Sequence, residues 1–545
     1  MIEGPEKNRV TRVADTVSAT LHAHGVRYAF GMPGGEVVTL IDGLLTAGIS
    51  FHLARHETAA AIMAAGANAI SRNPEVLVTT VGPGLANAVN GIADAAQEHV
   101  PLIVISGIVD RATRARYTHQ VIDHAELLRP LVKASFEVEP ESAASTVARA
   151  IALATAEPMG PVHLDLSPTV AATACPSPRI VSPPMLIKVK TSIADPAIAT
   201  LKRRINRAER PLIIAGLEAT RDDAANGLRQ LAETIGAPVI TTYKAKGAVP
   251  EDHALSLGGA GLSPLADGVL LQLVERSDLV LAVGYDPIEM RLGWLDFCSG
   301  GKKLIEITAA APDHAMHHAG LRMIAELGPF LKALSGALAA RRTWKDEEPA
   351  DAKRRLRKLF ATRAPWGPHA IIDALGSHAA DDAVVTVDSG AHRILLSQKW
   401  VAKRPSTLLQ SAGFCTMAAA LPLAIGAKVA DPRRRVFAIM GDGGLEMGIG
   451  ELAALRDLDL PLTIVVFQDQ SLALIALKQA SAGLAAAGVA LGQTDFAAVA
   501  KGFGGHGVNV ERIDDFRNEL EAARERPGFT LVCCRFDARA YENAF

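Results

Sequence analysis

Short apolar runs alternate with longer helical patterns in three parts of the 545-residue chain. Mostly apolar runs bounded by turn residues are typical of buried strands, and their alternation with helices predicts βαβ units and mainly parallel sheets. We therefore expect an α/β protein whose parallel sheets are flanked by helices. The predicted strands are Tyr28–Phe30, Val76–Thr79, Leu102–Ile105, Pro211–Ala215, Leu279–Val283, Lys303–Ile307, Arg435–Met440, Leu462–Phe467 and Phe529–Cys533.

Two polar segments divide this pattern into three domains. A proline-rich joint (Cys175–Pro178 and Ser182–Pro184) favours an extended linker, and a charged stretch (Lys345–Lys358) precedes a third block near Pro368. A chain of this length exceeds what one hydrophobic core usually supports. The expected domains are 1–175, 190–340 and 365–545. The first and third look like similar units, which suits a cofactor held between two related domains.

Composition narrows the class of protein. Apolar residues make up 49% and charged residues 21% of the chain, with a net charge of −2, so neither a nucleic acid nor a membrane partner is expected. We see no apolar run that could span a bilayer and no signal peptide, which predicts a cytoplasmic protein. Five scattered cysteines predict reduced, buried thiols.

The most informative motif lies between residues 441 and 469. One predicted strand breaks at Gly441–Gly444, and the next predicted strand stops at Gln468-Asp469. Ligands of α/β sheets bind at the carboxyl ends of the strands, where glycines allow backbone N–H groups to approach phosphate. A carboxylate there can hold a hard divalent cation. Asp442 and Asp469 therefore indicate a Mg²⁺–diphosphate site.

Two motifs near the N-terminus allow more than one interpretation. The run from Phe51 reads as a strand that ends at Glu57, with a helix from Thr58. Glu57 either favours the positive end of the helix dipole or exchanges a proton with a cofactor ring nitrogen. Gly82-Pro83-Gly84 forms a glycine turn after a strand, for close ligand approach or for geometry alone.

Other candidate motifs are weaker. The segment Gly502–Gly507 follows a helical stretch, so it lacks the context of a dinucleotide fingerprint, and we interpret it as a helix C-cap and loop. Several histidines lack a zinc spacing with cysteine or acidic partners and are interpreted as surface or packing residues. These are His119, His124, His314, His317 and His318.

Together the motifs resemble the thiamine-diphosphate-dependent enzymes, in particular the large subunit of the acetolactate (acetohydroxyacid) synthases. The resemblance covers nearly the whole chain, in the order pyrimidine-binding, central and diphosphate-binding domain. It implies thiamine diphosphate and Mg²⁺ as cofactors, and a homodimer at minimum, usually a homotetramer. It is carried by Phe30–Gly35, Arg55–Glu57, Gly82–Gly84, Asn87–Asp94, Pro101–Gly107, Thr416–Met417, Leu421–Ala427 and the Asp442 motif.

The resemblance also implies residue roles. Glu57 matches the glutamate that protonates the cofactor's aminopyrimidine, and Met417 the apolar residue that supports its bent conformation. The Cys415 carbonyl would accept a hydrogen bond from the aminopyrimidine, and His392 would contact the diphosphate. The predicted catalytic residues are Glu57 and Gln120. The predicted cofactor-binding residues are Gly34, Gly35, Glu57, Gly82, Pro83, Asn87, Gly390, His392, Cys415, Met417, Gly441, Asp442, Gly443, Gly444 and Asp469. The predicted metal ligands are Asp442, Asp469 and a main-chain oxygen near Ser471.

The chain departs from the family pattern at several positions. The pair Gln468-Asp469 stands where the family normally has two asparagines, and Ala391 replaces the glutamine of the biosynthetic synthases. Lys478 replaces their tryptophan, and His119 replaces a phenylalanine beside the retained Gln120. The segment Gly284–Arg291 resembles the catabolic, flavin-free synthases, so FAD is not expected.

The resemblance implies a decarboxylating carboligase. The cofactor ylid would attack a 2-oxo acid, CO₂ would leave, and the resulting enamine would add to a second carbonyl. Simple decarboxylases have an acidic residue at position 35 and an adjacent histidine pair near 113–125. Gly35 and the non-adjacent His119 and His124 therefore favour carboligation.

Two alternatives remain open. One is a decarboxylase, lyase or acyltransferase acting on another small acidic 2-oxo or aldehyde substrate, which Arg291 could bind. The other is a non-catalytic cofactor-binding homologue. The retained Glu57 argues against the second alternative, because cofactor binding alone does not need that carboxylate.

Overall fold

The computed structural model describes residues 10–176, 180–183, 196–221, 223–290, 292–298, 301–312 and 316–545. These residues form three six-stranded sheets, and the strand pairings in each sheet are parallel. The sheets fall within the three ranges expected for the domains. The α/β prediction is therefore confirmed. By their internal contacts, however, the residues group into two compact units.

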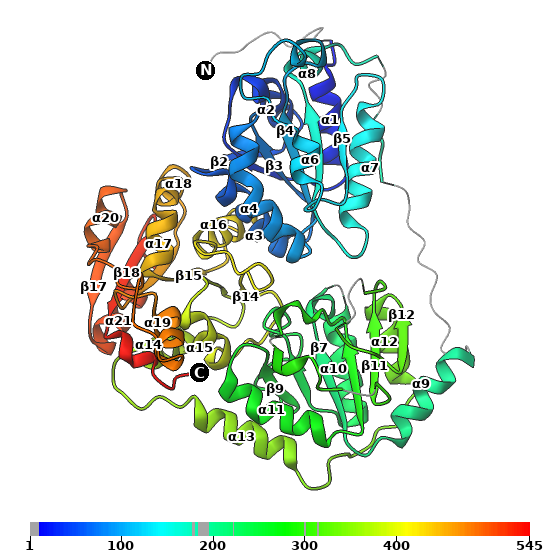
Figure 1. Cartoon of the computed structure of the whole chain (residues 1–545), viewed down its shortest axis with the longest axis vertical. Coiled ribbons are helices and arrows are strands. Elements are labelled where there is room, and N and C mark those ends of the chain that lie inside the picture. Colours follow the sequence, from blue (N-terminus) through cyan, green and yellow to red (C-terminus); the bar gives the residue numbers. More distant parts are fainter. Residues whose placement is uncertain are drawn as a thin grey trace. The chain divides into compact units, whose positions relative to one another are not determined.

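The first unit contains the N-terminal sheet, coloured blue to cyan in Figure 1, together with two C-terminal segments, Ile425–Pro432 and Gly450–Leu458. Its strand order is β2-β1-β3-β4-β6-β5. The strands are β1 (Tyr28–Gly31), β2 (Ser50–Leu53), β3 (Glu75–Thr79), β4 (Leu102–Gly107), β5 (Ser135–Glu137) and β6 (Val162–Leu166). The helices are α1 (Val13–Ala23), η1 (Gly35–Val37), α2 (Val38–Thr46), α3 (Glu57–Ser71), α4 (Pro83–Gln97), α5 (Arg111–Arg114), α6 (His124–Leu128), α7 (Ala143–Thr155) and α8 (Pro168–Ala172).

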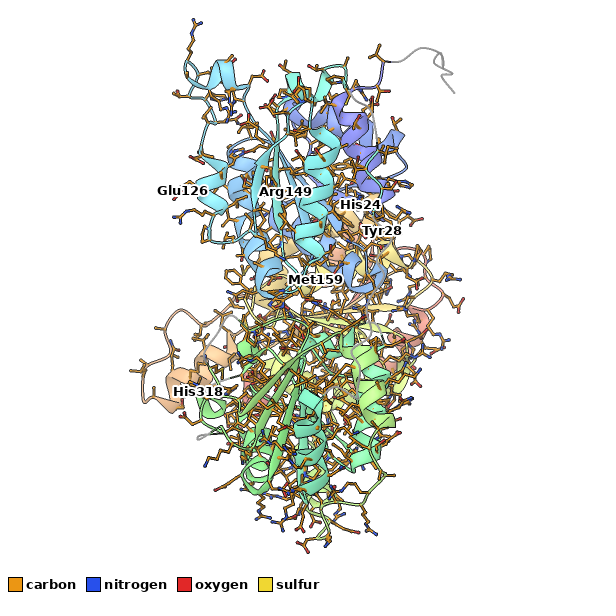
Figure 2. All side chains as sticks on the ribbon, turned by 90° about the vertical axis from the view of Figure 1, so that its right-hand side faces the viewer. His24, Tyr28, Glu126, Arg149, Met159 and His318 are labelled. Atoms are coloured by element: carbon orange, nitrogen blue, oxygen red, sulfur yellow. The ribbon has the colours of Figure 1, made fainter. Side chains whose placement is uncertain are left out.

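Burial in this sheet follows strand position. Every residue of β3, β4 and β6 is buried, whereas the edge strand β2 is partly exposed along its length. Inner strands of a parallel sheet are covered on both faces, so their residues are buried whatever their polarity. At the other edge, Arg149 of α7, labelled in Figure 2, lies over the ring of Phe136 in β5, 4.8 Å from its centroid. This cation–π contact covers the short edge strand.

The second unit contains the central and C-terminal sheets, coloured green and yellow to red in Figure 1. The central strand order is β12-β11-β10-β7-β8-β9. Its strands are β7 (Pro211–Ala215), β8 (Val239–Thr241), β9 (Ser256–Gly259), β10 (Leu279–Val283), β11 (Leu304–Thr308) and β12 (Leu321–Ile324). Its helices are α9 (Pro196–Arg207), η2 (Leu217–Thr220), α10 (Ala224–Ile235), α11 (Pro264–Arg276), η3 (Pro287–Glu289), η4 (Leu292–Trp294) and α12 (Leu327–Gly336).

The C-terminal sheet has the order β14-β13-β15-β16-β18-β17. Its strands are β13 (Val384–Val387), β14 (Leu408–Leu409), β15 (Val436–Gly441), β16 (Thr463–Gln468), β17 (His506–Val510) and β18 (Thr530–Arg535). The helices after the central sheet are α13 (Glu348–Leu359), α14 (Pro368–His378), α15 (Ala391–Lys399), α16 (Ala420–Ala430), α17 (Asp442–Gly448), η5 (Ile449–Glu451), α18 (Leu452–Asp457), α19 (Ala473–Ser481), α20 (Phe496–Gly502), α21 (Ile513–Ala522) and η6 (Ala538–Tyr541).

The local sequence predictions hold with three corrections. The strand expected from Phe51 ends at Leu53, and α3 begins at Glu57 itself. The segment 502–507 ends a helix as predicted, but β17 begins inside it at His506. Cys415 is exposed, whereas the other four cysteines are buried, so the expectation of buried thiols is wrong at that position. Among the described residues, no helix combines the length and apolar character needed to cross a membrane.

One close helix contact in the first unit yields a stability prediction. A Cβ added to Gly426 of α16 would lie 1.9 Å from the Met63 carbonyl oxygen of α3, so Gly426→Ala must push the two backbones apart. We expect a loss of about 1–3 kcal/mol in the free energy of unfolding, measured by denaturant titration with circular dichroism.

The matched control is Gly268→Ala in α11, where an added Cβ meets nothing within 4 Å. Alanine there should stabilise the helix by about 0.5–1 kcal/mol. Equal effects of the two substitutions would contradict the packing argument.

Candidate active site

A pocket of about 250 Å³ lies at the carboxyl ends of strands in the C-terminal sheet. Neighbouring strands β13, β15 and β16 are each followed directly by an aspartate: Asp388, Asp442 and Asp469. Parallel strands place these residues at one edge of the sheet, where α/β proteins bind ligands. The predicted residues that line the pocket are Gly390, His392, Cys415, Met417, Gly441, Asp442, Gly443, Gly444, Asp469 and Ser471. All predicted site residues of the third domain thus meet in one pocket.

Two carboxylates in this pocket, Asp442 and Asp469, repel each other electrostatically. Asp442 accepts backbone N–H groups from Gly443 (2.9 Å) and Gln470 (2.7 Å), and Asp469 accepts the Ser471 N–H (2.9 Å). Burial raises the pKa of Asp442. Burial, together with the nearby Asp442 charge, raises the pKa of Asp469 to about 7. A hard divalent cation would relieve this repulsion, so the donor set fits Mg²⁺.

A histidine supplies an unpaired polar atom in the same wall. His392 is buried, and its Nε2 has no hydrogen-bond partner among the described residues. Burial, and secondarily the charge of Arg393, lowers its pKa to about 3, so the ring is neutral at neutral pH. A Cβ at Gly390 would lie 2.7 Å from the ring, so only glycine fits at position 390 without displacing His392. The residues present therefore fit an anionic group such as a diphosphate.

Asp388 was missed by the sequence analysis although it organises the pocket wall. Its fully buried carboxylate accepts the N–H groups of Ala418 and Ala419, both at 3.0 Å. Burial raises its pKa to about 6. A Cβ at Gly444 would lie 2.0 Å from its Oδ2. Its position directly after an apolar strand, like that of Asp442, was the signal that could have revealed it.

The Cys415 carbonyl, expected to bind the aminopyrimidine, already accepts a hydrogen bond. The donor is the Ser389 hydroxyl at 2.8 Å. A carbonyl oxygen has two lone pairs, so a second donor can still bind. Cys415 has a φ of 58°, a left-handed backbone conformation that is rare for residues other than glycine.

Two residues at positions where the chain departs from the family lie outside the pocket lining. The Gln468 side chain is buried and turned inward, donating to the Thr494 carbonyl (2.8 Å) and accepting from Arg535 (3.0 Å). Lys478 is exposed on α19. The same helix instead offers Leu474 and Ile475 to the pocket, which leaves that wall apolar.

The predicted N-terminal residues also come together, in the first unit. Glu57 is buried at the first position of α3, and its Oε2 accepts a hydrogen bond from Asn87 Nδ2 at 3.1 Å. A Cβ at Gly84 would lie 3.3 Å from Glu57 Oε1, and one at Gly82 would lie 2.3 Å from the Gln120 carbonyl oxygen. Glycine is therefore required at 82 by the Gln120 segment.

The remaining N-terminal predictions lie beside this turn. Pro83 occupies the first turn of α4, where its missing N–H costs nothing. A Cβ at Gly34 would lie 2.5 Å from Thr80 Oγ1, whose hydroxyl donates to Glu36 at 2.6 Å. Gly35 is exposed, and a Cβ there would meet nothing within 4 Å.

Glu451 is a second residue that the sequence analysis missed. Its buried carboxylate accepts the Arg55 N–H through both oxygens, at 2.9 and 3.2 Å. The Arg55 side chain pairs with Asp457, the last residue of α18. Burial raises the pKa of Glu451 to about 7. This carboxylate fixes the backbone two residues before Glu57, and no sequence pattern links residues so far apart.

The histidines divide into three groups. His119 and His318 are exposed, and His317 packs against the ring of Tyr285, as expected of surface and packing residues. His124 is buried, and its Nδ1 lies 2.7 Å from Asp165 Oδ1, an acidic partner that the spacing along the sequence did not reveal. His314 and Arg291 lie outside the described residues.

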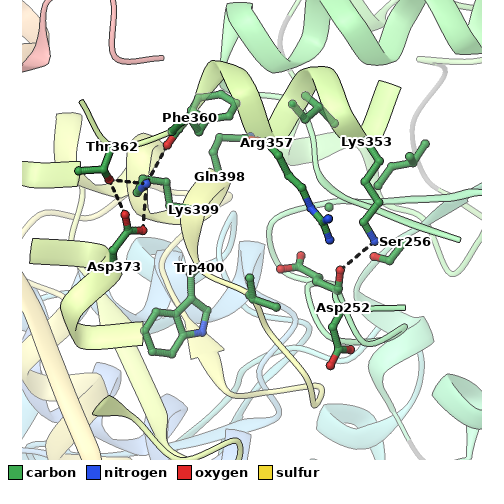
Figure 3. A pocket seen from close by; sticks show the side chains of 16 residues that line it. Asp252, Ser256, Lys353, Arg357, Phe360, Thr362, Asp373, Gln398, Lys399 and Trp400 are labelled. Carbon is green, nitrogen blue, oxygen red and sulfur yellow. Dashed lines mark hydrogen bonds and ion pairs between the residues drawn. The ribbon is translucent and has the colours of Figure 1, made fainter. Parts of the chain in front are cut away.

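A second pocket of about 420 Å³ in the second unit is lined by more charged residues (Figure 3). Its two lysine ammonium groups already have hydrogen-bond or ion-pair partners. Lys399 pairs with Asp373 at 2.9 Å and donates to the Phe360 carbonyl at 2.7 Å. Lys353 donates to the carbonyls of Glu251 (3.1 Å) and His253 (2.5 Å). Because these ammonium groups have their partners, they are poorly placed to recruit an anionic ligand.

Known proteins match the chain along most of its length. The profiles of the thiamine pyrophosphate enzyme N-terminal binding, central and C-terminal binding domains match residues 11–127, 198–334 and 388–534. The chain is 29% identical to an acetolactate synthase of Bacillus subtilis, covering 96% of this chain and 92% of that protein. It is 30% identical to a probable acetolactate synthase large subunit of Methanocaldococcus jannaschii, covering 94% and 89%. It is 28% identical to a catabolic acetolactate synthase of Raoultella terrigena, covering 96% and 95%.

The order of the matched domains is the order expected from the sequence. The C-terminal pocket lies within the range matched by the C-terminal binding domain. Glu57, Asn87 and Gln120 lie within the range matched by the N-terminal binding domain. The chain belongs to the thiamine pyrophosphate enzyme family and is related to the acetolactate synthases.

Proposed function

We propose that the protein is a thiamine-diphosphate- and Mg²⁺-dependent carboligase that decarboxylates a small 2-oxo acid, such as pyruvate, and joins the remaining acyl unit to a second carbonyl compound. The observation that carries this proposal is the pocket that combines Asp442, Asp469 and the unpaired Nε2 of His392. When bound, thiamine diphosphate supplies the nucleophilic carbon that attacks the 2-oxo acid. We further propose that FAD is not required.

The roles of the protein residues follow from their surroundings. Asp442 and Asp469 would hold the cation, and His392 would contact the diphosphate. Glu57, oriented by Asn87 at 3.1 Å, would exchange a proton with the aminopyrimidine ring nitrogen. Gln120 would contact the substrate beside the Gly82 turn. The apolar side chains Leu474 and Ile475 would keep water from the reacting centre.

The first unit favours carboligation over simple aldehyde release. An enzyme that releases aldehyde needs a proton donor at the reacting carbon. His124 is buried and engaged with Asp165 at 2.7 Å, and Gly35 carries no side chain. Neither position supplies the acid expected of a simple decarboxylase. The acyl unit is thus left to react with a second carbonyl.

The reaction is tested by incubating the purified protein with thiamine diphosphate, Mg²⁺ and a panel of 2-oxo acids. CO₂, aldehyde and acyloin should be measured separately, and we expect CO₂ and acyloin from at least one acid. Glu57→Gln should lower turnover by about 10²–10⁴-fold, because it removes an acid–base group, while cofactor binding measured by calorimetry stays close to wild type.

Glu126→Gln serves as the control, since Glu126 is exposed on α6. Aldehyde without acyloin from pyruvate would exclude the ligase reaction. Unchanged turnover in Glu57→Gln would exclude the proposed role of that carboxylate.

The metal site is tested through its charge. Asp469→Asn removes one of the two facing carboxylates, and affinity for hard cations follows the number of charged ligands. We expect Mg²⁺ or Mn²⁺ binding to the cofactor-free protein to weaken about tenfold, measured by calorimetry or Mn²⁺ resonance. Asp495→Asn, at an exposed carboxylate of the same sheet region, should leave binding unchanged. Equal effects of both substitutions would remove Asp469 from the ligand set.

We also propose a homodimer, or a tetramer built from dimers, in which Glu57 of one subunit serves the cofactor held by another. Exposed apolar side chains beside the C-terminal pocket, Phe414 and Met447, are consistent with a partner surface. Co-refolding Glu57→Gln with Asp442→Ala chains should restore about a quarter of wild-type activity, because half of the random dimers hold one intact site. Activity no higher than that of either variant alone would mean that both residues act within one subunit.

A further inference from the structure

A buried polar network in the first unit has no part in the proposed chemistry. It joins His124 of α6 to Asp165 and His163 of β6, and continues to Ser135 of β5 and Ser106 of β4. All three titratable members are at most 6% exposed. Buried polar groups cost free energy unless they are fully paired, so a network of this kind needs a physical reason.

The network could be mistaken for a metal site, because ligand atoms of His124, His163 and Asp165 lie within 4.8 Å of one another. The nitrogens of His163 are, however, both engaged. Its Nδ1 lies 2.7 Å from Ser135 Oγ and its Nε2 lies 3.1 Å from Ser106 Oγ. A metal would have to break these contacts and displace well-packed side chains.

The hydrogen bonds of His124 fix its tautomer. The Asp165 carboxylate can only accept, so His124 Nδ1 carries the proton across the 2.7 Å contact. The other nitrogen, Nε2, then has a free lone pair. That lone pair faces the backbone N–H of Gly82 at 3.4 Å, an obligatory donor. The arrangement works only with the neutral ring in this tautomer.

The place of His124 follows from the start of its helix. Asp123 caps α6 by accepting the Glu126 N–H at 2.9 Å, which sets the register of this short helix. His124 is buried. Glu126, two residues later, is exposed and lies at the edge of the molecule in Figure 2. The helix follows the Gln120 segment directly, so His124 ties that segment to the β6 carboxylate.

We propose that His124, oriented by Asp165, is a positioning residue that holds the Gly82–Pro83 turn against the Gln120 segment. The turn packs closely against this segment, because a Cβ on Gly82 would lie 2.3 Å from the Gln120 carbonyl oxygen. The turn also starts the helix whose Asn87 orients Glu57. His124 thus sets the distance between Glu57, the proposed proton-transfer group, and Gln120, the proposed substrate contact. The inference rests on the proposed function only in assigning Glu57 and Gln120 to the catalytic site.

Three substitutions separate this role from simple packing. His124→Phe keeps the ring but removes the acceptor, and Asp165→Asn removes the carboxylate that sets the tautomer. His124→Gln returns a carbonyl acceptor near the Nε2 position and should restore most of the lost function. The matched control is His52→Phe in the same unit, since His52 Nε2 has no partner among the described residues and its ring stacks on Phe30.

The first measurement is hydrogen exchange of the holoenzyme, followed by mass spectrometry. We expect amides in residues 81–87 to exchange about tenfold faster in His124→Phe and Asp165→Asn than in wild type or His52→Phe. Equal exchange in all four proteins overturns the proposal, whether or not a substrate is known. One zinc per chain in wild type, lost in His124→Phe, would overturn it in favour of a metal site.

The second measurement is steady-state kinetics. His124→Phe should lower kcat/KM about tenfold, mainly through KM, and shift the ratio of acyloin to aldehyde. His124→Gln should recover to within about threefold of wild type. If kcat/KM fell equally in His124→Gln, or equally in His52→Phe, His124 would be a packing residue and the proposal would be wrong. If the wild-type protein were inactive on all 2-oxo acids, the proposed function would be contradicted. The hydrogen-exchange measurement would then test the role of His124 on its own.

Discussion

In each of the two units, buried carboxylates that accept backbone N–H groups hold loops next to candidate site residues. Asp388 holds Ala418 and Ala419, Asp442 holds Gln470, and Glu451 holds Arg55. Each bond is charge-assisted and therefore stronger than a neutral one. Burial nevertheless raises the pKa of all three carboxylates. The desolvation penalty of the charged form is therefore larger than the stabilisation that these hydrogen bonds provide. The site is ordered at a cost in electrostatic free energy.

This cost explains why the carboxylates lie where they do. A parallel strand ends with exposed backbone groups, and the following residue can turn its side chain toward the N–H groups of a neighbouring loop. Asp388, Asp442 and Asp469 occupy this place after β13, β15 and β16. The same geometry that builds the loops also concentrates negative charge at one edge of the sheet. A bound cation or a proton can relieve that concentration, and the proposed metal site would use the cation.

The sequence was informative where function and local pattern coincide. Asp442 and Asp469 both follow strongly apolar strands, and Asp442 is also flanked by glycines, so both could be located without a structure. Asp388 obeys the same rule, but its strand β13 was not among the predicted strands, so the aspartate at its end was not singled out. Glu451 lies 396 residues from Arg55, and Asp165 lies 41 residues from His124. Pairs at such separations leave no periodic signal, because only the tertiary fold brings them together.

The charge balance of the pocket suggests an order of binding. The described residues that line it include no lysine or arginine, although it would hold a diphosphate. His392 is neutral, and the nearby Arg393 is turned to the Ser411 carbonyl at 2.6 Å and the Cys415 sulfur at 3.4 Å. Two aspartates would then repel the diphosphate unless a divalent cation lies between them. With a second carboxylate at 469 and no lysine or arginine among the described lining residues, the proposed cation would be the main positive charge beside the diphosphate, so cofactor affinity should depend on it more steeply than with asparagine at this position.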